Sequence, residues 1–216
     1  MAICGNESKA RPSEEPSHVC PAGGGAKSVR QPRGSENART LGLMATSNAQ
    51  TPSSNAPSEA LAAVSNAIAS YESGPAKLRA ACAGLTDAQL NTRIGPGEWS
   101  IMENAVHLLD SDLASTHRKR RIVAEENPLL IAYDENAFIA RLPSAQANLA
   151  EVLDVFEANR RFTARWLRTL PFEAFARTGV HTQRGKVTLL QVVEIYANHV
   201  DHHLKFVMEK RRNLGV

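Results

Sequence analysis

Cysteine, aromatic residues and long apolar runs are all scarce in this 216-residue chain, and each scarcity excludes a class of protein. The three cysteines (Cys4, Cys20 and Cys82) are odd in number and lack the spacing of a disulfide framework, so we expect a cytoplasmic location rather than secretion. No apolar run approaches the roughly 20 residues that a membrane-spanning helix needs, and the first residues lack the apolar stretch of a signal peptide. We therefore expect no membrane partner.

Net charge is also small. The formal charge is +3, and beyond residue 56 the chain holds 19 basic and 18 acidic side chains, so bulk charge gives no argument for nucleic-acid binding. One basic run, residues 117–121 (HRKRR), has no interleaved aromatic residues and no known reader motif, and we interpret it as a solvated helix face. Arg118 and Arg121 could pair there with acidic residues on a neighbouring helix. The sequence predicts no nucleic-acid partner.

Residues 1–56 differ in composition from the rest. They are rich in Ser, Pro, Gly, Asn and Ala and have scarcely any apolar periodicity, so they cannot bury enough surface to offset the entropy of ordering. We predict a disordered N-terminal extension over 1–56 and a single folded domain over 57–216. Met44 offers an alternative start, and we hypothesise that residues 1–43 are an over-extension of the coding sequence; a transit peptide is the alternative.

The remainder shows helical periodicity. Three capping boxes, Thr86/Gln89, Ser100/Glu103 and Thr188/Gln191, mark expected helix starts. Ser144 is expected to cap a further helix, Gly74-Pro75 to break or kink the first, and residues 171–187 to be irregular or to form a hairpin. The expected long helices cover about residues 58–85, 100–126, 144–170 and 188–212, with a short one at 134–142. Four long helices with short links predict an all-α, antiparallel four-helix bundle.

Two histidines one helical turn apart, His199 and His203, continue the apolar row of the last helix and should point toward the bundle core. Their ring nitrogens need partners there, and a metal ion is one such partner. His107, in the second long helix, could supply a third ligand. Three protein ligands with an open fourth position are typical of catalytic metal sites. The alternative is that these are ordinary core histidines. A zincin mechanism is excluded, since Val200 stands where that motif has Glu.

Three further residues are candidates for catalysis or for orienting the ligands. Glu103 lies four residues before His107 and Asp110 three residues after it, on the same helix face. Either carboxylate could accept a hydrogen bond from the second ring nitrogen of His107, or act as a metal ligand itself. His181 lies in a loop between two glycines and could contact a substrate or be ordinary surface. We interpret Trp99 as a core anchor.

Two stretches carry a family resemblance. PGEWSIMENAVHLLDSD (residues 96–112) and GKVTLLQ (185–191) followed by the histidines of the last helix resemble the signature segments of the DinB-like superfamily, in matching order over about residues 58–212. The resemblance implies an up-down-down-up four-helix bundle holding zinc or nickel through His107, His199 and His203. Asp112 stands where many members have Glu, which leaves its role open.

The resemblance implies an activity only in outline. Characterised relatives resemble thiol-dependent transferases and isomerases that use low-molecular-weight thiols, and metal-dependent hydrolases have also been proposed. We therefore expect an enzyme that acts on a small-molecule substrate by activating water or a small thiol. The alternative is a non-enzymatic, stress-linked metal-binding or scaffold bundle. Family members also imply a homodimer formed through helix faces.

Overall fold

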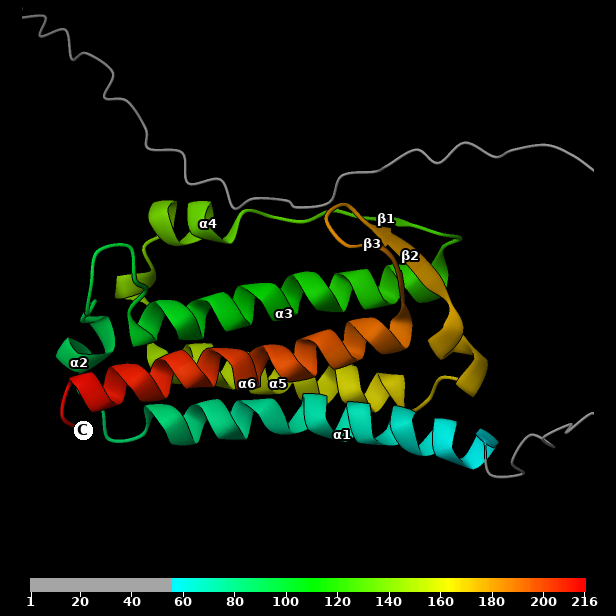
Figure 1. Ribbon diagram of the computed structural model, residues 1–216, viewed down its shortest axis with the longest axis horizontal. Helices are drawn as coiled ribbons and strands as arrows, with labels where there is room; N and C mark the ends of the chain where they lie inside the picture. The colour runs from blue at the N-terminus through cyan, green and yellow to red at the C-terminus, as the bar shows by residue number, and fades with distance from the viewer. Residues whose placement is uncertain (1–55) are drawn as a thin grey trace, which may run out of the picture. The chain divides into compact units, whose positions relative to one another are not determined.

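Four long helices make up the body of the described chain (Figure 1). The computed structural model describes the backbone of residues 56–216 and the side chains from residue 58. The predicted disorder of residues 1–56, together with the domain boundary after it, lies outside the described residues and stays a prediction. The long helices are α1 (Ala56–Cys82), α3 (Ile101–Ala124), α5 (Leu149–Leu167) and α6 (Leu189–Asn213). The predicted all-α bundle is confirmed.

The helices run up, down, down and up, as the resemblance implies. In Figure 1 the colour order shows α1 and α6 running one way and α3 and α5 the other. Each helix packs against two others, in the order α1, α6, α3, α5 and back to α1. Because α3 and α5 are parallel, the chain must return along the bundle between them. That return segment carries strand β1 (Leu129–Leu130), helix α4 (Glu135–Arg141) and a 3-10 turn.

All three predicted capping boxes are present. They begin α2 (Asp87–Asn91), α3 and α6, and in each the hydroxyl accepts a backbone N–H while the Glu or Gln side chain accepts the N–H of the cap residue. The cap predicted at Ser144 is wrong. Asn148 caps α5, its Oδ1 accepting the N–H groups of Ala150 (2.9 Å) and Glu151 (3.3 Å), while Ser144 opens the 3-10 turn. Helix α5 ends at Leu167, three residues before Leu170. Pro171 follows Leu170, and a proline disfavours helical backbone in the residue that precedes it.

Helix α1 continues through Gly74-Pro75, so of the predicted break or kink the break does not occur. Proline donates no hydrogen bond, which would leave the carbonyl of Tyr71 without its helical partner. That oxygen instead accepts Nη1 of Arg160, on α5, at 2.8 Å. A Cβ atom on Gly74 would lie 2.4 Å from the same Nη1. Gly74 thus leaves space for the guanidinium of the buried Arg160, and Pro75 leaves the carbonyl of Tyr71 free to accept a hydrogen bond from it.

The segment 171–187 is structured, which confirms the hairpin alternative and not the irregular one. Strands β2 (Thr178–His181) and β3 (Gly185–Thr188) pair antiparallel, and β2 also pairs in parallel with β1. Gly185 has a φ of 73°, a conformation that glycine adopts without steric cost. Four-residue strands are too short to show a clear alternation in sequence. The hairpin leads directly into α6 and sets His181 beside that helix.

Between two apolar clusters the bundle holds a buried polar network, which we define as Tyr71, Asp112, Lys119, Asn159 and Arg160. Asp112 is fully buried and accepts Arg160 Nε at 3.1 Å, Asn159 Nδ2 at 2.6 Å and the Tyr71 hydroxyl at 3.1 Å. Lys119 is fully buried as well, with its ammonium 4.2 Å from the centre of the Tyr71 ring. This settles the structural role that the sequence left open for Asp112.

The interpretation of residues 117–121 as a solvated face is therefore wrong for two of its members. Lys119 belongs to the buried polar network and Arg118 is also buried, while Arg121 pairs with Glu125 on its own helix. Helical periodicity turns α3 by about 100° per residue, so a run of five basic residues must cover both faces. In the described chain no helix combines the length and apolarity that crossing a bilayer requires.

Candidate metal centre

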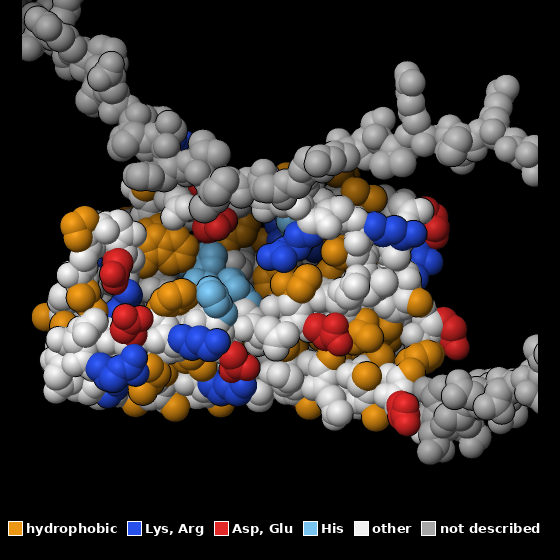
Figure 2. Space-filling model, in the orientation of Figure 1, with side chains coloured by type: hydrophobic (Ala, Val, Ile, Leu, Met, Phe, Trp, Pro, Cys, Tyr) orange, Lys and Arg blue, Asp and Glu red, His pale blue; other side chains and the backbone are white. Residues whose placement is uncertain are grey.

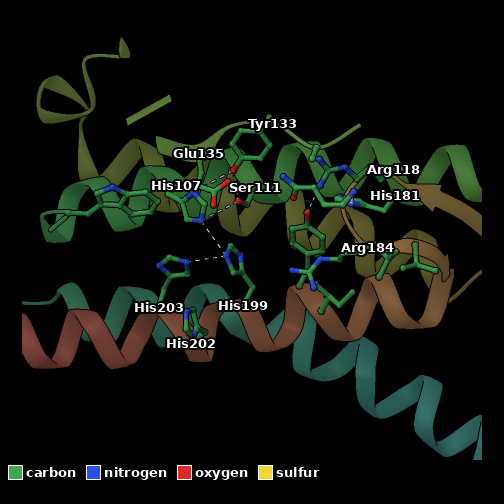
Figure 3. Close-up of a pocket in the computed structure, with 17 residues that line it drawn as sticks. His107, Ser111, Arg118, Tyr133, Glu135, His181, Arg184, His199, His202 and His203 are labelled. Atoms are coloured by element: carbon green, nitrogen blue, oxygen red, sulfur yellow. Dashed lines mark hydrogen bonds between the residues drawn. The ribbon is translucent and has the colours of Figure 1, made fainter. Parts of the chain in front are cut away.

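Three histidines from two helices meet at one point (Figure 3). His107 comes from α3, and His199 and His203 come from adjacent turns of α6. The Nε2 atom of His199 lies 3.3 Å from that of His107 and 3.0 Å from that of His203. One ring nitrogen from each residue lies within 4.8 Å of the others. The structure therefore brings together all three residues that the resemblance proposes as ligands.

The donor set fits a divalent cation. In a tetrahedral site with metal–nitrogen distances of about 2.0–2.1 Å, neighbouring nitrogens lie about 3.3 Å apart, close to the 3.3 Å and 3.0 Å that separate the Nε2 atoms here. A proton on His199 Nε2 can reach only one of its two imidazole neighbours, so direct hydrogen bonds do not link all three rings. A cation would satisfy all three lone pairs at once. These observations support His107, His199 and His203 as a metal site.

Asn104 fixes which nitrogen of His203 faces the site. Its Nδ2 donates to the carbonyl of Ser100 at 2.8 Å, which turns its Oδ1 toward His203. That oxygen accepts the Nδ1 proton of His203 at 2.9 Å, so the lone pair of a neutral His203 is on Nε2. An orienting acceptor of this kind is usual behind a metal-binding histidine. No pattern in the sequence singles out Asn104, which lies three residues before His107.

The imidazoles are held neutral. Burial lowers the pKa of His107 to about 4, that of His199 to about 3 and that of His203 to about 2, and for His199 and His203 the neighbouring imidazoles lower it further. For His107 the carboxylate of Glu135 acts in the opposite direction and favours the charged form. Metal ligands must be unprotonated. The site is therefore ready to accept a cation at neutral pH without losing protons first.

The histidines form one wall of a pocket of about 390 Å³. They reach the surface in a hollow (Figure 2), so the side of the site away from the helices is open. Trp99 also lines the pocket, its ring stacked on that of His203 with centroids 6.2 Å apart. The prediction of Trp99 as a core anchor is thus incomplete, because the side chain is half-buried and faces the site. A pocket of this size suits a small molecule.

The three residues predicted as catalytic candidates lie at three different places in the structure. Glu103 accepts from Arg93 Nε (2.9 Å) and from the backbone of Ser100, where it completes the capping box, and it makes no hydrogen bond with His107. Asp110 is half-buried and lines a neighbouring cavity of about 300 Å³ beside Phe138. Neither carboxylate orients His107. His181 does line the histidine pocket, which favours the first of its two interpretations, substrate contact over ordinary surface.

Residues that the sequence did not single out complete the pocket wall. Glu135, in the first turn of α4, supplies the carboxylate that acts on His107. Ser111 Oγ lies 2.5 Å from the hydroxyl of Tyr133, and both lie 3.5 Å from nitrogens of His107. Ser111 is one turn after His107 on the same face, so helical spacing could have found it. Glu135 and Tyr133 arrive through the return segment after α3, and no local pattern connects them to the site.

A half-open site of three histidines in a four-helix bundle defines a class of metal-binding helical proteins. Within that class, the chain belongs to the DinB superfamily, whose family model matches residues 70–207. It is 34% identical to YfiT of Bacillus subtilis over 150 residues, covering 68% of this chain and 84% of that one. A Bacillus cereus relative is 27% identical over 148 residues, covering 68% and 85%. Both relatives are provisionally named as metal-dependent hydrolases.

A solved structure supports the same assignment. The structure of Bacillus subtilis YfiT matches this chain with a TM-score of 0.67 and 30% identity, covering 70% of this chain and 87% of the other. It is described as an unusual four-helix bundle. In the present bundle the parallel pair α3 and α5 requires the long return segment.

Proposed function

We propose that this protein is a divalent-metal-dependent enzyme that acts on a small molecule, with water or a low-molecular-weight thiol as nucleophile. The observation that carries the proposal is the convergence of three neutral imidazole Nε2 atoms at the open wall of a 390 Å³ pocket. Imidazole ligands suit several divalent transition metals, and we propose zinc or nickel, the two metals that the family resemblance implies. The provisional names of the relatives point to the same kind of chemistry.

A bound divalent ion would supply Lewis acidity and bring the pKa of a coordinated water or thiol toward neutrality. The protein residues would do the remaining work. The Glu135 carboxylate, which lies on the pocket wall and acts electrostatically on His107, would take the proton of the nucleophile. Within the Ser111–Tyr133 pair one hydroxyl donates to the other at 2.5 Å, and the second hydroxyl would donate a hydrogen bond to a substrate oxygen. Burial raises the pKa of Tyr133 to about 12, so its hydroxyl keeps its proton at neutral pH.

Two reactions fit this arrangement. A hydrolase would turn over an ester or amide with water alone, and the names of the relatives favour it. A thiol S-transferase would consume an electrophile only when a small thiol is added. The two are separated by measuring turnover of ester, amide and electrophile substrates with and without thiol, in zinc-loaded and nickel-loaded protein.

The metal site is tested on full-length protein purified without an affinity tag. Elemental mass spectrometry should find about one zinc or nickel per chain in the wild type and none in the His199→Ala, His203→Ala double variant. His202→Ala is the matched control, because that histidine lies on the same helix with an exposed side chain and should leave the metal content unchanged. Absence of metal after incubation with both ions would reject the proposal in favour of a non-enzymatic scaffold.

The catalytic part of the proposal has its own test. Glu135→Gln keeps the shape of the side chain and removes the proton acceptor, so kcat should fall roughly 10²–10⁴-fold while metal content stays at one per chain. Unchanged kcat would show that Glu135 is not the base. The cytoplasmic location and the homodimer expected from the sequence stay predictions.

A further inference from the structure

The pocket that holds the histidines has a second end of opposite character. Figure 3 shows the histidine triad and Glu135 at one end and Arg118, His181 and Arg184 at the other. These last three come from separate elements: α3, strand β2 and the turn of the hairpin. In the described part of the chain neither arginine has a carboxylate partner within ion-pair distance. Two uncompensated positive charges therefore face the same cavity.

Arg118 is held rigidly in this position. Its side chain is more than nine-tenths buried, Nη1 donates to the hydroxyl of Tyr196 at 2.6 Å, and Nη2 donates to the carbonyl of Ile131 at 2.6 Å. Both acceptors are neutral, so they orient the guanidinium without cancelling its charge. A guanidinium has five N–H donors, and these bonds account for two. A buried cation without an anionic partner is costly, which makes this placement hard to explain by stability alone.

Two neighbours add hydrogen-bond donors at the same end. The N–H of Gln183 donates to Nδ1 of His181 at 3.3 Å, so a neutral His181 carries its proton on Nε2. The Tyr196 oxygen accepts from Arg118, and its own proton is left to donate. Burial raises the pKa of Tyr196, which keeps that proton in place at neutral pH. Charge and donors at this end thus suit a group that only accepts hydrogen bonds.

We propose that Arg118 and Arg184, with His181 and Tyr196, bind an anionic group of the substrate, a carboxylate or a phosphate. The planar fork of arginine matches both groups. An anionic group held at this end fixes the direction in which the substrate lies. Its reacting group is then at the histidines. This inference rests on the proposed function, because it names the substrate class of the same pocket.

The test measures binding of two probe anions, inorganic phosphate and malonate, by calorimetric titration of the full-length protein, once in the presence of a chelator and once with zinc loaded. Arg184→Gln removes one charge from an exposed side chain and should weaken binding of the preferred anion about tenfold, the loss expected for one charge-assisted interaction. Arg118→Lys keeps the charge and loses the fork, and it should also weaken binding. Arg212→Gln, at the end of α6, is the matched control and should bind like wild type.

The outcomes separate this inference from the proposed function. Binding by either anion that falls in Arg184→Gln and not in Arg212→Gln supports the subsite, and the tighter anion identifies the group. Binding that is unchanged in Arg184→Gln, or no binding of either anion, overturns it. Binding only to zinc-loaded protein, with no effect of either arginine, places the anion on the metal and overturns the subsite while leaving the metal proposal intact. Anion binding in a protein that takes up no metal would reject the proposed function alone.

Discussion

Replacing Asn104 by Ala should weaken metal binding without touching a ligand. Asn104 contacts His203 through one hydrogen bond, 2.9 Å long, which holds the Nδ1 proton and so leaves Nε2 free. Without it, the ring can rotate or adopt the other tautomer, in which Nε2 carries the proton and cannot bind a cation. Both residues are buried, so water replaces the lost acceptor poorly.

The size of the effect follows from this geometry. Loss of an orienting acceptor behind a metal-binding histidine typically lowers affinity 10–100-fold, or about 1.4–2.7 kcal/mol. The fold should survive, because the carbonyl of Ser100, which loses the Asn104 side chain, still accepts the helical N–H of residue 104 at 3.1 Å. An unpaired buried Nδ1–H should cost about 1–3 kcal/mol of unfolding free energy in the metal-free protein.

The assay is competition for zinc between the protein and a chromophoric chelator, with circular dichroism to establish that each variant is folded. Asn198→Ala is the control, because Asn198 is exposed and precedes His199 on the same helix. Its affinity should equal that of the wild type. An Asn104→Ala protein that is folded and binds zinc as tightly as wild type would refute the role of Asn104 and the argument that His203 binds through Nε2.

Two further predictions concern the buried polar network. Asp112→Ala leaves Arg160 buried without its carboxylate and should lower the unfolding free energy, measured by urea titration, by about 3–5 kcal/mol. The control Asp154→Ala breaks only an exposed pair with Arg79 and should lower it by about 1 kcal/mol or less. Similar losses in the two variants would contradict the importance of the buried polar network. Burial lowers the pKa of Lys119 to about 7. The unfolded chain, with a lysine pKa of about 10.4, therefore binds more protons between about pH 7 and 10, and this residue makes stability rise with pH across that window. Lys119→Met should flatten the rise, and an equal slope in both proteins would disprove the shift.

Local signals in the sequence predicted much of the fold. The capping boxes at Thr86, Ser100 and Thr188 are contained in four-residue segments, and each begins a helix where expected. Errors arose where a local signal had a competitor nearby or a partner far away. Ser144 has the composition of a cap, yet Asn148 is the residue that binds the free N–H groups. Gly74-Pro75 is a helix breaker in isolation, but Arg160, 85 residues later, accommodates it.

In the candidate site, too, local spacing predicted some features and contacts between distant segments decided the others. His199 and His203 lie one turn apart, so helical geometry alone places them on one face, and this much the sequence determined by itself. The meeting of His107 with them depends on α3 packing against α6; the sequence offered His107 as a possible third ligand, and the resemblance implied that it is one.

Tertiary structure alone decided the rest of the pocket. The return segment brings Glu135 to the histidines, and the hairpin brings His181 and Arg184 to the far end. The tertiary structure also buries Arg118 and Lys119, although the sequence of their basic run predicts a solvated helix face. The physical reason is that spacing within a helix is fixed by 1.5 Å and 100° per residue, whereas contacts between segments depend on how the whole chain buries its apolar faces.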